Sequence, residues 1–174
     1  MASEGGHVDY APRTPLEYEL LNYMRDKLGG RVSYERVLSG PGLFNIYSFL
    51  RDHKYAEEPD WLAEETKAGD ASAVVSAAGL AGKCELAVKS LDLFASIYGA
   101  MAGNLSLILK ATGGLYVGGG IAPKIIEKLK DGVFMNAFTD KGRMSALVAS
   151  IPVRVILDDK TALYGAARYA LEQS

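Results

Sequence analysis

The sequence predicts a mostly helical α/β domain with a small parallel sheet. About two-thirds of the chain has apolar residues at helical spacing. Two short apolar runs in the C-terminal third, Gly114–Val117 and Pro152–Leu157, are bounded by Gly, Pro or Asp as strands usually are. Helical segments separate these runs, which favours parallel pairing. Because two strands are too few for an independent sheet, we expect part of an α/β domain whose remaining strands lie elsewhere.

The first predicted helix covers Pro15–Leu28 and has clear signals at both ends. Its apolar residues recur at helical spacing, Thr14 is a candidate N-cap, and Gly29 is a stop signal. Proline is well tolerated in the first helical turn, where its missing N–H has no intrahelical partner in any case.

The central part of the chain is also predicted to be helical. A short helical turn at Tyr34–Leu38 is followed by the Ser-Gly-Pro-Gly sequence, which we interpret as a break. Further helices are expected at Leu43–Arg51, Trp61–Ala68, Ala71–Ala81 and Lys83–Ala111. The last of these is one long helix or two helices joined near its glycines, whose small size would let another backbone approach closely.

The C-terminal third alternates strands and helices. Its expected elements are a strand at Gly114–Val117, a helix at Lys124–Lys130 opened by Pro123, a helix at Gly142–Ser150 with Asp140 as N-cap, a strand at Pro152–Leu157 and a helix at Thr161–Glu172. Both strands are apolar at consecutive residues, which is typical of strands covered by helices on both faces. We expect them to be parallel neighbours, with one open sheet edge that promotes association.

Composition indicates an ordinary globular domain. The 174 residues are 49% apolar and 23% charged, with a formal net charge of −2 and no basic block. This argues against a dedicated nucleic-acid binder. The single cysteine, Cys84, excludes an internal disulfide and a multi-cysteine zinc site. We see no metal-ligand spacing elsewhere.

The same features favour a cytoplasmic protein with no membrane association. One cysteine suits a reducing compartment. The N-terminus lacks a basic region followed by an apolar run, which argues against a signal peptide. The most apolar stretch, Leu91–Leu109, contains Asp92 and Asn104, so we interpret it as a buried helix.

A glycine-rich stretch is the clearest candidate for ligand binding. The strand ending at Val117 runs into Gly118, Gly119 and Gly120 before a predicted helix. Glycines let a ligand approach the backbone, and a helix N-terminus offers free N–H groups. The alternative is a tight strand-to-helix turn without a ligand. The pattern matches neither a P-loop nor a GxGxxG motif.

Two further stretches carry candidate polar ligands. Glu35 precedes the turn that contains Ser39 and Gly40, and Glu4 and His7 flank a Gly-Gly step. Carboxylates bind sugar hydroxyls well, because each carboxylate oxygen can accept strong charge-assisted hydrogen bonds. The alternatives are a solvated surface residue for Glu35 and a disordered chain end for Glu4 and His7.

Taken together, these stretches resemble bacterial glucokinases outside the repressor-and-kinase (ROK) group. The resemblance is carried in order by EGGHVDYAP, ERVLSGPGLFNIY, GGLYVGGGIAPK, FTDKGRM and IPVRVILDD, and it covers nearly the whole chain. It implies the C-terminal half of an actin-like (ribonuclease H-like) ATPase fold, with residues 1–174 forming the large C-terminal domain and the N-terminal domain absent. The implied reaction is phosphorylation of glucose at its 6-hydroxyl by ATP and Mg²⁺, in a cytoplasmic enzyme that forms a homodimer.

The resemblance also implies roles for individual residues. Glu4, His7 and Glu35 match residues that hydrogen-bond glucose hydroxyls. Gly118–Gly120 match the adenosine-side glycine motif, and the fold would place Ser39 and Gly40 near the nucleotide. The family's phosphate loops and general-base Asp have no counterpart here, so no catalytic residue and no metal ligand is assigned, and we expect the chain alone to be inactive.

Three functions remain open at this point. The first is the C-terminal part of a glucokinase. The second is a non-catalytic sugar-binding or regulatory module built from half of the kinase fold. The third is a structural or interaction domain that keeps its glycine-rich turn for packing alone.

Overall fold

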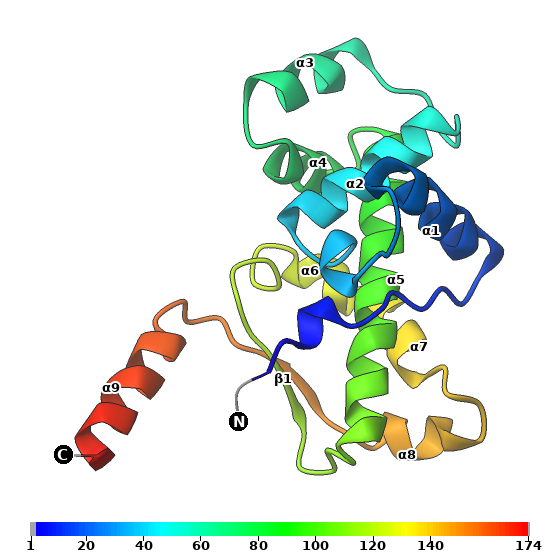
Figure 1. Ribbon diagram of the computed structural model, residues 1–174. Helices are drawn as coiled ribbons and strands as arrows, with labels where there is room; N and C mark the ends of the chain where they lie inside the picture. The colour runs from blue at the N-terminus through cyan, green and yellow to red at the C-terminus, as the bar shows by residue number, and fades with distance from the viewer. Residues whose placement is uncertain (1–2, 174) are drawn as a thin grey trace.

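The computed structural model describes residues 3–173 and is dominated by helices (Figure 1). The α-helices are α1 (Pro15–Leu28), α2 (Gly40–Asp52), α3 (Asp60–Ala68), α4 (Ala71–Leu80), α5 (Glu85–Ile108), α6 (Ile126–Lys130), α7 (Val133–Thr139), α8 (Ser145–Ala149) and α9 (Thr161–Gln173). The strands are β1 (Leu115–Val117) and β2 (Val153–Val155), and the 3₁₀ turns are η1 (Gly5–His7), η2 (Tyr34–Arg36) and η3 (Gly142–Met144). The predicted fold class is confirmed: a mostly helical domain with a small parallel sheet.

Helix α5 is the scaffold of the domain and runs unbroken through its glycines (Figure 1). An added Cβ at Gly99 would lie 2.1 Å from the carbonyl oxygen of Phe134, and one at Gly103 would lie 2.4 Å from that of Phe138. The backbone of α7 therefore packs directly against α5. The expectation that small residues in α5 allow close approach is confirmed, and the alternative of two helices is excluded.

Helix α5 is also long and apolar enough to cross a membrane, by length and composition alone. In this structure, however, 56% of its most apolar window is buried by the rest of the chain. Its neighbours include α2, α4 and α7. Packing in the domain core thus accounts for its apolar composition.

Strands β1 and β2 pair in parallel, as predicted, with Leu115 opposite Val153 and Val117 opposite Val155. These four side chains belong to or pack against the hydrophobic core. The other face of the sheet is open: Tyr116 is 62% exposed, with the guanidinium of Arg154 over its ring. The expectation of helices on both faces is therefore wrong for the residues described, because the middle residue of each strand is exposed.

Helix α1 has the predicted bounds and caps. The hydroxyl of Thr14 accepts a hydrogen bond from the Glu17 N–H, and Gly29 has the left-handed conformation typical of a helix end. Helix α2, in contrast, begins at Gly40 rather than Leu43. The side chain of Ser39 caps it by accepting from Gly42 N–H, so the proline after Gly40 opens the helix instead of breaking it.

Four differences concern the connection between the strands. Helix α7 was not predicted from the sequence, and Asp140 follows it instead of capping the next helix. The predicted helix at Gly142–Ser150 is a 3₁₀ turn, η3, followed by α8. Helix α6 begins only at Ile126, so the glycine-rich stretch leads into a turn rather than directly into a helix.

The C-terminal helix α9 projects from the body of the domain (red in Figure 1). It has the predicted position but contains no buried residue. Leu163, Tyr164 and Tyr169 are each at least 59% exposed. Apolar groups therefore remain uncovered along this helix.

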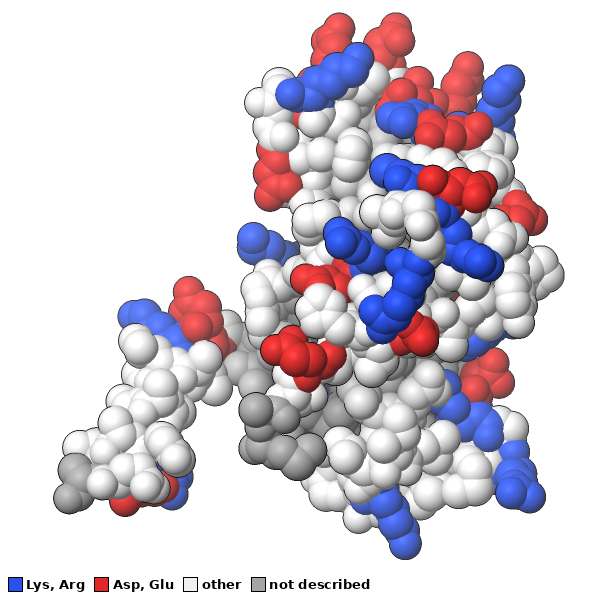
Figure 2. All heavy atoms as spheres, viewed as in Figure 1, with Lys and Arg blue, Asp and Glu red and all other residues white. Residues whose placement is uncertain are grey.

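Charges of both signs are distributed over the surface. On the face shown in Figure 2, Lys and Arg are interspersed with Asp and Glu, in keeping with the small net charge of −2. This face consequently offers no broad region of a single sign.

We predict that the 174-residue chain self-associates at high concentration. Within residues 3–173, β1 and β2 pair only with each other, so both outer edges carry unpaired backbone groups, and α9 adds exposed apolar side chains. Size-exclusion chromatography with light scattering should show dimers or larger species whose fraction rises with concentration. A stable monomer at high concentration would contradict this expectation.

Candidate functional site

A short antiparallel contact brings two sequence-distant segments together near the N-terminus. Asp9 and Ser33 form a β-bridge. The Tyr10 N–H donates to the Val32 carbonyl at 2.9 Å, and the Tyr34 N–H donates to the Val8 carbonyl at 3.0 Å. His7 precedes this contact on one segment and Glu35 follows it on the other. Because the segments are antiparallel, the two residues are placed beside each other.

Glu4, His7 and Glu35 form one polar cluster. Nε2 of His7 lies 3.5 Å from Oε2 of Glu35 and 3.8 Å from Oε2 of Glu4. The 3₁₀ turn η1 spans Gly5–His7 and turns Glu4 and His7 toward the same side. The structure therefore brings these three candidate residues together on one surface, although their roles remain predictions.

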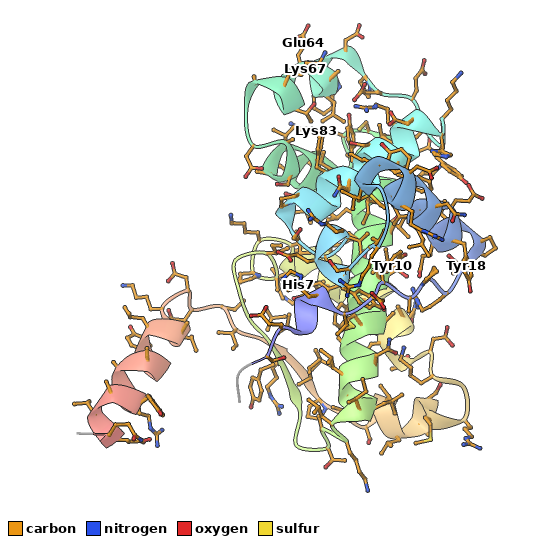
Figure 3. The ribbon with its side chains drawn as sticks, in the orientation of Figure 1. His7, Tyr10, Tyr18, Glu64, Lys67 and Lys83 are labelled. Carbon is orange, nitrogen blue, oxygen red and sulfur yellow. The ribbon has the colours of Figure 1, made fainter. Side chains whose placement is uncertain are left out.

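The cluster is accessible to a ligand. The side chains of Glu4, His7 and Glu35 are 87%, 61% and 55% exposed. Figure 3 shows His7 on the N-terminal segment. An imidazole between two carboxylates can donate and accept hydrogen bonds, which suits a ligand with several hydroxyl groups. Within residues 3–173, no three His, Cys, Asp or Glu side chains are arranged to hold a metal ion.

Buried aromatic rings support the segment that carries this cluster. Tyr10 and Tyr34 follow the antiparallel contact and pack edge to face, with ring centroids 5.5 Å apart. Their side chains are 4% and 5% exposed. Burial raises the pKa of both phenols, so they stay neutral and serve as packing groups.

An ion pair between the partly buried Arg13 and the buried Glu17 ties the same segment to α1 and α5. Nη2 of Arg13 donates to Oε1 of Glu17 at 2.6 Å and to the Ser96 hydroxyl at 2.8 Å. The Arg13 N–H donates to Oε2 of Glu17 at 2.9 Å. Because Glu17 is only 1% exposed, its carboxylate depends on these partners for its charge compensation.

The polar cluster is connected to a second feature through Ser39. The Ser39 hydroxyl donates to the Glu35 carbonyl at 2.7 Å while accepting from the Gly42 N–H at 3.0 Å. Ser39 and Gly40 also line the wall of a cavity of about 460 Å³. The Glu35 backbone is thus fixed by the residue that begins α2 beside the cavity.

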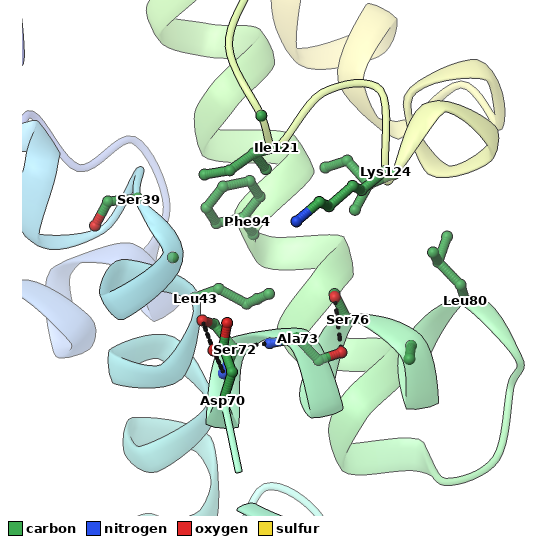
Figure 4. A pocket seen from close by; sticks show the side chains of 14 residues that line it. Ser39, Leu43, Asp70, Ser72, Ala73, Ser76, Leu80, Phe94, Ile121 and Lys124 are labelled. Carbon is green, nitrogen blue, oxygen red and sulfur yellow. Dashed lines mark hydrogen bonds between the residues drawn. The ribbon is translucent and has the colours of Figure 1, made fainter. Parts of the chain in front are cut away.

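The cavity lies between α2, α4, α5 and the loop after β1 (Figure 4). It brings Gly120 together with Ser39 and Gly40, which are about 80 residues away in sequence. Its apolar lining residues include Leu43, Phe94, Ile121 and Ile125, and its polar ones Asp70, Ser72, Ser76 and Lys124. A mostly apolar lining with a few polar groups is typical of a small-molecule site.

The three glycines differ in their positions. Gly120 lines the cavity, whereas Gly118 and Gly119 are not among its lining residues. Gly119 has a φ of +98°, a conformation that side-chain-bearing residues rarely adopt, so at least this glycine is required by the turn itself.

Two charged residues of the cavity were not identified from the sequence. The Asp70 carboxylate accepts from the N–H groups of Ser72 and Ala73 at the start of α4. The hydrogen bond from the Ser72 hydroxyl is the main cause that lowers the pKa of Asp70, and the charge of Lys124 contributes. Lys124 itself forms no hydrogen bond or ion pair with the described side chains. The Asp-Ala-Ser helix start is a sequence signal for Asp70 as a cap, but no pattern points to Lys124.

Comparison with known proteins gives consistent results along the whole chain. The family model described as Glucokinase matches residues 1–173. A glucokinase of Synechocystis sp. is 51% identical over 179 residues, covering 95% of this chain and 50% of that protein. A glucokinase of Nostoc sp. is 47% identical over 177 residues, covering 95% of this chain and 52% of that protein. The chain therefore spans about half the length of the curated relatives it matches.

Solved structures agree with these relatives. The crystal structure of glucokinase from an Antarctic psychrotroph superimposes with a TM-score of 0.80 at 34% identity, covering all of this chain and 51% of that one. Glucokinase from Balamuthia mandrillaris in complex with glucose gives a TM-score of 0.73 at 24% identity, covering 88% and 42%. The second likeness supports the fold alone.

This ion pair yields a stability prediction. Replacing Arg13 by Met leaves the Glu17 carboxylate buried without its partner. Because the Arg13 side chain is partly exposed, the free energy of unfolding should fall by about 2–3 kcal/mol, less than for a fully buried pair. Adding Glu17→Met should recover much of the loss, because two apolar groups no longer need charge compensation. Urea denaturation measures both effects.

Arg25→Met is the matched control, since it removes an equal charge from the exposed surface of α1. It should change stability by no more than about 0.5 kcal/mol. An Arg13→Met effect as small as that of the control would show that the ion pair does not anchor this segment.

Proposed function

The chain belongs to the glucokinase family, and we propose that it forms the C-terminal, large domain of an ATP-dependent glucose kinase. Its fold is the C-terminal half of the actin-like ATPase fold that the structurally similar glucokinases have. The proposal covers residues 1–174 as one domain. In the complete enzyme, the product would be glucose 6-phosphate.

The observation that carries the proposal is the convergence of Glu4, His7 and Glu35. Ser39 links the Glu35 carbonyl to the wall of the cavity. We assign these three side chains to glucose. Glu4 and Glu35 would accept hydrogen bonds from sugar hydroxyls, while His7, which lies between them, would donate or accept. Several fixed partners discriminate strongly between sugars, because a hydroxyl that is missing or misplaced leaves a partner unpaired.

We assign the cavity to the nucleotide. Its apolar lining around Phe94 and Ile121 fits a purine base, and Gly120 leaves room for close approach. Ser39 and Gly40 form the wall nearest the sugar cluster, and Gly118 and Gly119 complete the turn. Lys124 is a cation available for a phosphate group. The purine base would thereby be held on this domain, and the phosphates of the nucleotide would be directed toward the sugar.

Mg²⁺ belongs to this proposal only through ATP. The described residues offer no grouping of three ligands for a metal ion, so no part of the chain is assigned to it. A kinase uses Mg²⁺ to neutralise charge on the transferred phosphate. Here the chain's own residues bind and orient glucose and hold the adenosine side of the nucleotide.

Transfer of the phosphate requires groups beyond these 174 residues. The sequence contains no counterpart of the family's phosphate loops or of its general-base Asp. We propose that these groups come from the other half of the kinase, and that the enzyme acts as a cytoplasmic homodimer. No feature of residues 3–173 favours a non-catalytic sugar-binding module over this interpretation.

Glucose binding by the chain tests the sugar assignment. Titration with glucose should shift the amide resonances of residues 4–7 and of Glu35. Glu35→Gln should weaken binding by roughly 10-fold or more, because it removes a charge-assisted hydrogen bond. Glu64→Gln on α3 is the control, since this exposed carboxylate lies far from the cluster (Figure 3). Equal binding by wild type and the Glu35 variant would refute the assignment.

A coupled assay for glucose 6-phosphate tests the missing machinery. The purified 174-residue chain should show no turnover with glucose, ATP and Mg²⁺, since loss of a general base alone typically lowers rates by about 10²- to 10⁴-fold. Turnover near that of ordinary kinases would contradict the proposal that transfer needs groups outside this chain.

A further inference from the structure

We propose that Arg31 is a positioning residue of the sugar site, holding the segment that carries Glu4 and His7 in its binding conformation. This inference rests on the proposed assignment of glucose to that cluster. Arg31 lies outside the motifs that carry the resemblance, and its proposed role comes from its contacts.

The guanidinium of Arg31 contacts the N-terminal segment at two points. Its Nε donates to Oδ1 of Asp9, and its Nη2 donates to the backbone carbonyl of His7. These acceptors lie on either side of Val8, where η1 ends and the antiparallel contact begins. A planar group that holds both points fixes how the two parts of the segment are oriented.

The turn after α1 delivers Arg31 to this position. Gly29 and Gly30 have φ values of +72° and +157°, and both N–H groups donate to the Arg25 carbonyl. The chain therefore reverses at the end of α1 and returns alongside residues 7–9. Arg31 is the first residue with a side chain after this reversal.

Few other contacts hold residues 4–7. Apart from hydrogen bonds within η1, their polar contacts to other described residues go to Glu35, through the His7 ring, and to Arg31, through the His7 carbonyl. A sugar that binds the cluster would compete for the His7 ring and for Glu35. The Arg31 contact uses only the backbone of His7, so it persists while the ring binds the ligand.

The expected effect is moderate because the Arg31 side chain is 61% exposed, and exposed ion pairs contribute little to global stability. Ordering a short segment before binding, however, lowers the entropic cost of binding its ligand. Loss of the contact should therefore lower the affinity for glucose while changing the stability of the folded chain little.

The experiment compares Arg31→Met, Arg31→Lys and the control Arg25→Met in the 174-residue chain. Arg31→Met should weaken glucose binding by about three- to ten-fold. It should also speed hydrogen exchange at the amides of His7 and Val8. Its melting temperature should change no more than that of the control. Arg31→Lys should fall between, since an ammonium group can replace one of the two contacts but not the paired geometry.

Specific outcomes would overturn the inference. Unchanged glucose affinity in Arg31→Met would show that the Arg31 contacts do not contribute to binding. An equal loss of affinity in Arg25→Met would show that the effect comes from net charge alone. Unchanged exchange at His7 and Val8 would show that Arg31 does not order the segment. Absence of glucose binding by the unmodified chain would instead refute the sugar assignment itself, and the exchange measurement would still decide whether Arg31 holds the segment.

Discussion

Two backbone hydrogen bonds between residues 8–10 and 32–34 determine where the candidate sugar ligands lie. They set the register that places His7 beside Glu35, although α1 separates these residues in sequence. Ser39 then joins the Glu35 carbonyl to the first turn of α2, which borders the cavity. The polar cluster proposed for the sugar and the cavity proposed for the nucleotide are therefore parts of one continuous arrangement, and a shift of this register would separate them.

Helix α5 gives this arrangement a rigid base. Its Ser96 accepts a hydrogen bond from Arg13, which anchors the N-terminal segment, and its Phe94 lines the cavity. Further along, Gly99 admits the backbone of α7. One buried helix thus supports both candidate sites and the connection between the two strands. Positioning by rigid elements is what kinase chemistry requires, because catalysis of phosphoryl transfer depends largely on geometry and charge neutralisation.

Local signals decided which parts could be predicted from sequence. Helix α1 was predictable because Thr14 and Gly29 mark its ends whatever surrounds it. Helix α7 was missed because Gly132 gives it no side-chain cap and its stability comes from packing on α5. Family motifs pointed to Glu35 and its partners, but their convergence depends on a two-residue bridge that no periodicity reveals. Lys124 was missed for a similar reason: only the tertiary fold places it in the cavity.

The central claim is that one sugar molecule is bound jointly by Glu4, His7 and Glu35. A crystal structure of this chain with glucose tests it most directly. The account predicts one glucose with hydroxyl oxygens about 2.6–3.2 Å from the His7 ring and from both carboxylates, with the contact between Asp9 and Ser33 unchanged. Glucose bound elsewhere on the chain, with the three side chains still paired to one another, would contradict it.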